Sequence, residues 1–234
     1  MANVVVTGAN RGIGLELVRQ HLDRGDQVIA GCRRPDHAEE LSQLGVRSIL
    51  PLDVADEASV TGFAERVVET LDGETLDVLY NNAGASVAAL GVERRDAGVL
   101  TVPMDAVEAL IRVNGLSAAT VSRALVPAMD TGSKIVNITS QIGSMVVAKR
   151  FADLPYSASK AVMNMVTVQL ATALEDQGIS VTCFHPGWVR TDMGGPSADL
   201  STTEAVAGII ATTDGHTIAD SGGFFRHDGT THPW

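Results

Sequence analysis

Cysteine, aromatic residues and long hydrophobic runs are scarce in this chain of 234 residues, and acids outnumber cations. The two cysteines, Cys32 and Cys183, belong to no CxxC or Cys/His pattern, which favours reduced thiols and no metal site. The net charge of −11 argues against nucleic-acid binding, which requires a basic surface. No apolar run approaches the ~18 residues that span a bilayer, and the first residues do not resemble a secretion signal. We therefore expect a cytoplasmic protein with neither nucleic-acid nor membrane partners.

Short β-branched runs alternate with longer helix-like stretches along the whole chain. Strands are predicted at residues 4–7, 27–31, 46–50, 78–80, 134–139, 179–184 and 223–226. Helices are predicted at residues 12–24, 57–71, 104–129, 155–176 and 204–211. This alternation predicts an α/β single-domain Rossmann fold over residues 1–234, with a doubly wound parallel sheet of about seven strands and helices on both faces.

A glycine-rich turn links the first predicted strand to the first predicted helix and reads Thr7-Gly8-Ala9-Asn10-Arg11-Gly12-Ile13-Gly14. Glycines leave backbone amides free to face a phosphate, and the helix N-terminus favours an anion. The glycine spacing is one residue longer than the usual dinucleotide fingerprint, and a tight turn that binds nothing is the alternative. The strand–turn–helix context favours a dinucleotide site, with contacts predicted from Gly8, Asn10, Arg11, Gly12, Ile13 and Gly14.

The end of the second strand decides which dinucleotide is expected, because the adenosine ribose is read there. This position carries Arg33 and no acid, and Arg33 can bind a 2′-phosphate, with Arg11 as a second cation. Two ordinary surface arginines are the alternative. Asp53, with its neighbour Val54, follows the third strand and is placed to bind the adenine, unless Asp53 caps the next helix. The sequence therefore predicts NADP(H) in preference to NAD(H).

A tyrosine and a lysine four residues apart, Tyr156 and Lys160, share one face of a predicted helix. An ammonium beside a phenol can lower its pKa by roughly 1–3 units, into the range of acid–base catalysis. Ser140 closes the fifth predicted strand, where a hydroxyl can donate to a carbonyl oxygen as charge develops on it. Asn114 lies inside a predicted helix and is followed by Gly115, which suits a polar role better than helix packing.

Taken together, these motifs resemble the short-chain dehydrogenase/reductase superfamily. The matching residues are Thr7-Gly8-x-x-x-Gly12-x-Gly14, Asn81-Asn82-Ala83-Gly84, Asn114, Ser140, Tyr156-x-x-x-Lys160 and Pro186-Gly187. Within the superfamily, residues 185–193 and the tail from Gly223 to Trp234 are most similar to C-factor and Sniffer-like carbonyl reductases.

The resemblance implies a role for each matching residue. Tyr156 would donate a proton to a substrate carbonyl while a nicotinamide delivers hydride, and Lys160 would lower the phenol's pKa and hold the nicotinamide ribose. Ser140 would stabilise the developing oxyanion, and Asn114 would position a water in a proton relay. The resemblance also implies a homodimer or homotetramer. Further cofactor contacts are expected from Asn82, Ala83, Gly84, Pro186, Gly187, Val189 and Thr191, besides Tyr156 and Lys160.

Substrate contacts are expected from loops beyond the ends of the strands. The candidates are Ser86, Gln141, Ile142, Met145, Phe151, Trp188 and Met193. Most are apolar, which favours a hydrophobic aldehyde or ketone, although several could instead be ordinary core residues. Residues 194–203 are either a lid or a plain loop.

The predicted function is NADPH-dependent reduction of an aldehyde, ketone or quinone to an alcohol. One alternative is a reductase of 3-oxoacyl thioesters, which needs the same catalytic set and a different pocket. Another is a non-catalytic signalling or dinucleotide-binding protein like the C-factors. Such a protein has no need for Tyr156, Lys160, Ser140 and Asn114 together.

Overall fold

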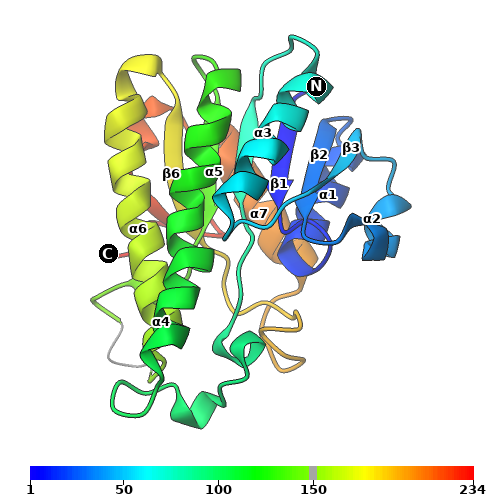
Figure 1. The fold of residues 1–234 in the computed structure, drawn as a ribbon. Helices are drawn as coiled ribbons and strands as arrows, with labels where there is room; N and C mark the ends of the chain where they lie inside the picture. The colour runs from blue at the N-terminus through cyan, green and yellow to red at the C-terminus, as the bar shows by residue number, and fades with distance from the viewer. Residues whose placement is uncertain (148–151) are drawn as a thin grey trace.

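The computed structural model describes residues 1–147 and 152–234, which form seven parallel strands between helices (Figure 1). The strand order is β3-β2-β1-β4-β5-β6-β7. The strands are β1 (Asn3–Thr7), β2 (Gln27–Cys32), β3 (Ser48–Pro51), β4 (Val78–Asn81), β5 (Lys134–Ile138), β6 (Ser180–His185) and β7 (Phe224–Arg226). The predicted doubly wound parallel sheet is confirmed.

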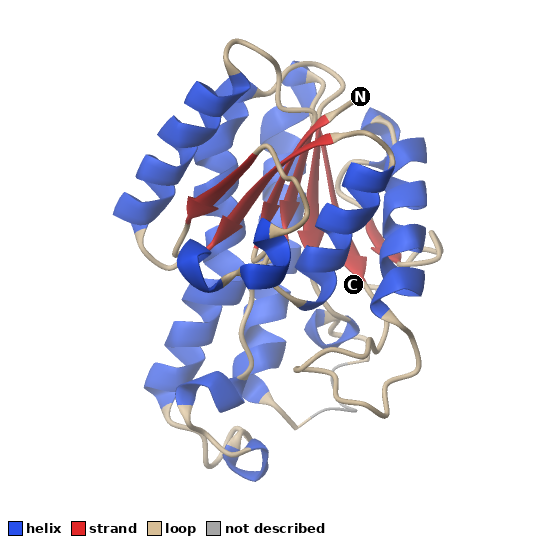
Figure 2. Cartoon of the chain, turned by 90° about the vertical axis from the view of Figure 1, so that its right-hand side faces the viewer, coloured by secondary structure: helices blue, strands red, loops and turns tan. Residues whose placement is uncertain are grey.

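Helices cover both faces of this sheet, as a second view shows (Figure 2). Helix α1 packs against α7 on one face, while α3, α5 and α6 pack side by side on the other (Figure 1). The helices are α1 (Gly12–Asp23), α2 (Glu39–Ser42), α3 (Glu57–Leu71), α4 (Met104–Leu110), α5 (Ser117–Leu125), α6 (Leu154–Leu174) and α7 (Thr202–Gly215). The π-helical turn η4 is Ile111–Leu116, and the 3₁₀ turns are η1 (Pro35–His37), η2 (Val87–Leu90), η3 (Arg94–Asp96), η5 (Val126–Ala128), η6 (Gln141–Gly143), η8 (Glu175–Gln177) and η9 (Ile218–Asp220).

The central strand β1 shows how the sheet is buried on both sides. Val4 and Val6 belong to one hydrophobic cluster, whereas Val5 between them belongs to a second. All three are fully buried. A parallel sheet sandwiched between helices requires this pattern, in which both alternating faces of a strand are apolar.

Several predicted bounds differ from the structure. The strand predicted at 46–50 runs over Ser48–Pro51. The helical stretch predicted at 104–129, with a possible break near Pro127, is divided by the η4 turn and gives way to the 3₁₀ turn Val126–Ala128. Helix α7 starts two residues earlier and ends four later than predicted. Its start is fixed by a capping box, in which Ser201 Oγ accepts from the amide of Glu204 and the Glu204 carboxylate accepts from the amide of Ser201.

The order in which the chain adds strands reverses at β1, since β2 and β3 lie on one side of it and β4 to β7 on the other. In open α/β sheets, ligands bind beyond the carboxyl ends of the strands at such a switch point. The turns that follow β1 and β4 are therefore the place to look for a site. In the part of the chain that the structure describes, no helix is both long and apolar enough to cross a membrane.

Candidate active site

The glycine turn after β1 is a close contact between backbones. Gly8 has a φ of +65°, and a Cβ there would lie 2.8 Å from the Cα of Ala83. A Cβ on Gly14 would overlap the carbonyl oxygen of Gly8 and lie 2.5 Å from Asn82 Nδ2. Gly12 has a φ of +54°. Glycine is needed at Gly8 and Gly12 for their backbone conformation, and at Gly8 and Gly14 because no other side chain fits.

Hydrogen bonds join this turn to the segment after β4. Thr7 Oγ1 accepts from the amides of Asn82 and Ala83, each at 3.0 Å. Asn82 Nδ2 donates to the Thr7 carbonyl at 2.9 Å. Gly84 follows, and a Cβ on it would lie 3.2 Å from Asn114 Oδ1. The ends of β1 and β4 thus form one continuous surface at the switch point.

The N-terminus of α1 suits a phosphate. Arg11 occupies the N-cap position without a side-chain cap hydrogen bond, and the first turn holds no acid. The positive end of the helix dipole is therefore not neutralised by the chain's own carboxylates. Asn10 is exposed beside it, while Ile13 is half-buried against the core. This turn fits the pyrophosphate of a dinucleotide.

The two predicted arginine contacts differ in their surroundings. Arg33 follows directly after β2 and is exposed. Arg11 is also exposed, but its Nη1 lies 3.0 Å from Asp192 Oδ2. The acid that pairs with Arg11 was not anticipated, because it lies 181 positions away in the sequence.

Asp53 is exposed after β3, and its Oδ1 accepts from the amide of Ala55 at 3.0 Å. The capping alternative for Asp53 was wrong, because the N-cap of α3 is Asp56, whose Oδ1 accepts from the amide of Ala58. Val54 packs at the edge of the second core cluster.

Tyr156 and Lys160 lie in the first two turns of α6, which Asp153 caps by accepting from the Tyr156 amide at 3.1 Å. Lys160 Nζ lies 5.8 Å from the centre of the Tyr156 ring. The ammonium donates to the backbone carbonyl of Ile138, at the end of β5, at 2.8 Å. The two side chains are neighbours, and the lysine also ties α6 to the end of β5.

The end of β5 carries Ser140 against α6. Thr139 Oγ1 donates to Asn164 Oδ1 of α6 at 2.7 Å. Ser140 follows, half-buried, and its Oγ accepts from the Ile142 amide at 3.4 Å, which caps the η6 turn. Ser140 therefore stands next to the helix that bears Tyr156 and Lys160.

Burial shifts both ionisable groups of this set toward their neutral forms. It raises the pKa of Tyr156 to about 12, with a smaller contribution from the Asp153 carboxylate. Burial also lowers the pKa of Lys160 to about 8. Burial outweighs any lowering of the phenol's pKa by Lys160 in this structure, in which the ammonium donates to the Ile138 carbonyl. Tyr156 is a protonated phenol at neutral pH, which suits a proton donor.

Asn114 is fully buried in the π-helical turn η4. Its Nδ2 donates to the Ala85 carbonyl and to Ser159 Oγ, and its Oδ1 accepts from the Ala85 amide at 2.8 Å. A Cβ on Gly115 would lie 2.8 Å from the Ser159 carbonyl of α6. Asn114 thus connects the segment after β4 to α6, one residue before Lys160, and Gly115 lets the two helices approach closely.

A closed loop follows β6. Pro186 is buried, Gly187 has a φ of +87°, and Val189 pairs with Leu200 in an isolated parallel bridge. Thr191 lies over the glycine turn, because a Cβ on Gly12 would be 3.3 Å from its methyl group. Residues 188–200 are therefore joined at their base, so the segment 194–203 is anchored where it begins and ends.

The predicted substrate residues lie on exposed loops. Met145 is 81% exposed, Trp188 49% and Met193 48%, and Trp188 Nε1 donates to the Gly194 carbonyl. Gln141 and Ser86 are half-buried, while Ile142 is buried. Phe151 lies outside the described residues. Burial thus separates Ile142 from the exposed members of this set.

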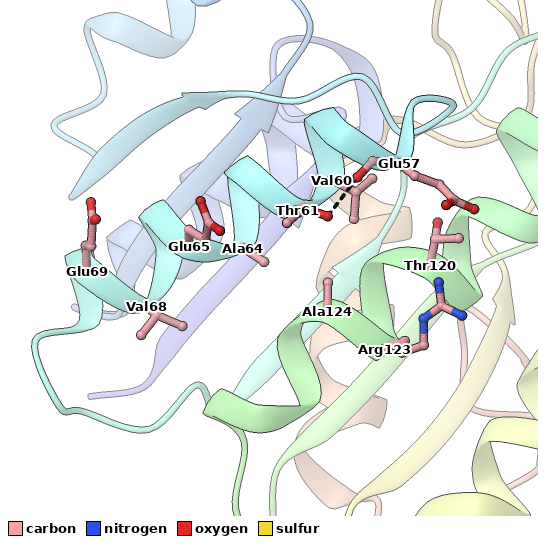
Figure 3. Close-up of a pocket in the computed structure, with 10 residues that line it drawn as sticks. All are labelled: Glu57, Val60, Thr61, Ala64, Glu65, Val68, Glu69, Thr120, Arg123 and Ala124. Atoms are coloured by element: carbon pink, nitrogen blue, oxygen red, sulfur yellow. Dashed lines mark hydrogen bonds between the residues drawn. The ribbon is translucent and has the colours of Figure 1, made fainter.

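A groove of about 640 Å³ lies elsewhere, between the outer faces of α3 and α5 (Figure 3). Its floor is apolar, with Val60, Ala64 and Ala124, and Glu57 and Arg123 stand on opposite walls. None of its lining residues was predicted as a site residue. The groove is separate from the switch point.

Sequence reasoning missed several residues that hold the site together. Thr7, Ser159 and Asn164 make the buried hydrogen bonds described above. Thr7 and Ser159 lie inside the quoted motifs, next to residues that were predicted. The signal was available for these two, since a hydroxyl beside a motif glycine or lysine can bond to a neighbouring strand or helix.

Comparison with known proteins places this arrangement in a family. The family model described as short chain dehydrogenase matches residues 2–200. The C-signal protein of Myxococcus xanthus is 35% identical over 164 residues, which cover 68% of this chain and 93% of that protein. The structure of an NADPH-bound carbonyl reductase from chicken fatty liver is 31% identical, with a TM-score of 0.90 over 100% of this chain and 99% of that one. The carbonyl reductase Sniffer of D. melanogaster is 27% identical, with a TM-score of 0.91 over 100% of both chains. The predicted resemblance is confirmed, and the chain belongs to the short-chain dehydrogenase family of oxidoreductases that use a nicotinamide dinucleotide.

Proposed function

We propose that this protein reduces the carbonyl group of an aldehyde, ketone or quinone to an alcohol, with Tyr156 as the proton donor. The observation that carries the proposal is the geometry at the carboxyl edge of the sheet, where the Tyr156 phenol lies beside Lys160 and Lys160 donates to the last residue of β5. Burial raises the pKa of this phenol to about 12, so it is protonated at neutral pH and is able to act as an acid. The carbonyl reductases of similar fold support the same reaction class.

The proposed mechanism assigns one task to each group. A reduced nicotinamide dinucleotide, when bound, supplies the hydride that adds to the carbonyl carbon. Tyr156 gives its phenolic proton to the carbonyl oxygen, and Ser140 donates a hydrogen bond to that oxygen as it becomes negative. Lys160, whose Nζ lies 5.8 Å from the centre of the phenol ring, would stabilise the phenolate that remains. Asn114 holds the segment after β4 against α6. Asn114 would also position a water that links Lys160 to solvent for proton transfer.

The cofactor site is proposed at the glycine turn and along the ends of β2, β4 and β6. Gly8, Gly12, Gly14 and the free N-terminus of α1 would hold the pyrophosphate. The adenine would lie near Asp53 and Val54, and the nicotinamide near Pro186, Gly187, Val189 and Thr191. Asn10, Ile13, Asn82, Ala83 and Gly84 would border the bound dinucleotide.

NADPH is the proposed form of the cofactor, because Arg33 stands where the ribose is read and no acid does. Replacing Arg33 with Ala removes hydrogen bonds to a charged group, which costs NADPH ~1.5–3 kcal/mol, or about 10–150-fold in affinity. Titrations of wild type and Arg33→Ala with NADPH and with NADH check this. An equal loss for both cofactors contradicts the phosphate role.

A homodimer or homotetramer is proposed through the outer faces of α5 and α6. Leu116, at the end of the η4 turn, is 47% exposed, and Met165 of α6 is 60% exposed. Large apolar side chains exposed on packed helices are typical of a surface that another copy covers. The molecular mass in solution, measured by light scattering, tests this, and a monomer at micromolar concentration contradicts it.

A signalling role is the second candidate, because the C-signal protein is a relative. The proposal favours catalysis over it, since Tyr156, Lys160, Ser140 and Asn114 are all present. Consumption of NADPH with a panel of apolar and polar carbonyl compounds separates the two. Turnover of apolar aldehydes or ketones is expected. No turnover of any carbonyl contradicts the enzyme reading, and turnover of only 3-oxoacyl thioesters replaces the substrate class.

A further inference from the structure

The loop after Ser140 has two parts that are held differently. Its first part, the η6 turn, lies tightly on α6: a Cβ on Gly143 would be 2.6 Å from the Lys160 carbonyl carbon, and Asn164 Nδ2 donates to the Gly143 carbonyl. The outer part, Met145 and Val146, is largely exposed. In the described chain, one hydrogen bond ties this outer part to another element, from the Val146 amide to the Trp234 carbonyl at 3.3 Å.

Trp234 is itself held on the edge of the sheet. Residues 231–234 run beside β7, where Thr231 pairs with Phe225 in an antiparallel bridge and the His232 amide donates to the Phe224 carbonyl at 2.7 Å. The Trp234 indole packs on Phe224 with ring centres 5.2 Å apart. The backbone of Trp234 is thereby fixed in a position that faces the loop.

The segment 231–234 also contacts the end of β6, next to the proposed nicotinamide site. The His232 ring is buried and lies 4.5 Å from the ring of Phe224 and 5.8 Å from that of His185. His185 ends β6 and directly precedes Pro186 and Gly187. Trp234 therefore joins the outer loop to the strand whose end is proposed to hold the nicotinamide.

We propose that Trp234 is a positioning residue for the substrate: by fixing Met145 and Val146, it sets the outer wall of the carbonyl site and selects the size of apolar carbonyl compound that is reduced. This inference rests on the proposed function. One hydrogen bond holds Val146 to Trp234, so Val146 is restricted only as much as the backbone of Trp234 is. The contact between the indole and Phe224 restricts that backbone. A firm apolar wall discriminates between substrates by contact with the larger one.

Hydrogen exchange tests the anchoring without any assay of activity. Exchange of the Val146 amide is compared in wild type, Trp234→Ala, Trp234→Phe and the control Val68→Ala. Val68 is an exposed apolar residue on α3, 50% exposed against 42% for Trp234. We expect about tenfold faster exchange in Trp234→Ala alone, because the alanine lacks the ring that holds the segment. Unchanged exchange in Trp234→Ala overturns the proposal.

Substrate discrimination tests the specificity role. The ratio of kcat/KM for a bulky aryl ketone to that for a short aliphatic aldehyde is expected to change about tenfold in Trp234→Ala. Trp234→Phe restores it, and NADPH affinity stays unchanged throughout. An unchanged ratio, or an equal loss for both substrates, overturns the specificity role while leaving the proposed function standing. If wild type reduces no carbonyl, the proposed function fails with the specificity role, and the exchange data still decide the anchoring.

Discussion

The two ends of the proposed site, the nucleotide end at the glycine turn and the carbonyl end beyond Ser140 and Tyr156, are lined by different kinds of atoms. The nucleotide end is mostly backbone: a Cβ on Gly8 would meet Ala83, one on Gly12 would meet Thr191, and one on Gly14 would meet the Gly8 carbonyl, each within 3.3 Å. The carbonyl end is mostly side chain, with Met145, Trp188 and Met193 about half exposed or more on loops. In the proposed site, backbone geometry and a few buried groups would hold the cofactor, while side chains on exposed loops would select the substrate.

The largest expected effect is on turnover at Tyr156, with little effect on cofactor binding. Replacing Tyr156 with Phe removes one hydroxyl and should lower kcat by about 10²–10⁴-fold, the usual contribution of a positioned acid. NADPH affinity should stay within about twofold, because no pyrophosphate contact is lost. Stopped-flow turnover together with NADPH titration measures both. Unchanged turnover would contradict the assignment of Tyr156 as the proton donor. An equal loss of NADPH affinity would contradict the claim that the two ends of the site act independently.

A smaller effect, on cofactor binding, is expected at Gly14. A Cβ there overlaps the Gly8 carbonyl, and overpacking of this kind costs about 1–3 kcal/mol; where this strain displaces the turn that holds the pyrophosphate, Gly14→Ala should weaken NADPH binding by about 5–150-fold. Gly62→Ala on α3 is the matched control, since a Cβ there meets nothing within 4 Å. The control should bind NADPH normally and be more stable by about 0.5–1 kcal/mol. Equal NADPH affinity in the two variants would argue against the nucleotide site.

The smallest effect concerns pH. Burial lowers the pKa of Lys160 to about 8, so its ammonium is present below that pH and is lost as the pH rises through it. Tyr156, with its pKa raised to about 12, stays protonated over the same range. The kcat/KM for reduction should therefore fall by about tenfold between pH 7 and pH 9. A profile that stays flat to pH 10 would remove Lys160 from the proton chemistry.

The same difference explains what the sequence could predict. Strand–helix alternation predicted all seven strands, because β-branched runs between helices leave few other topologies. The glycine turn was readable for a similar reason, since backbone conformation restricts residue type to glycine. The π turn around Asn114 was not readable, because it depends on how Ala85 and Ser159 bond to that side chain from distant segments.

Side-chain direction was the other limit. The spacing of Tyr156 and Lys160 predicted neighbours on α6, and they are neighbours, but it could not show that the ammonium bonds to Ile138. Nor could it show that Arg11 meets Asp192 or that Trp234 meets Val146. Each of these contacts joins residues from distant parts of the chain, so local pattern carries no signal for them.

The most direct test of the proposed chemistry follows the hydride itself. The protein is incubated with an apolar aldehyde and, in separate reactions, with each of the two forms of NADPH that carry deuterium on one face of the reactive nicotinamide carbon, and the alcohol is analysed by mass spectrometry. We predict one deuterium on the former carbonyl carbon from one of the two labelled forms and none from the other. Alcohol without deuterium from both forms, or no alcohol at all, would contradict the account.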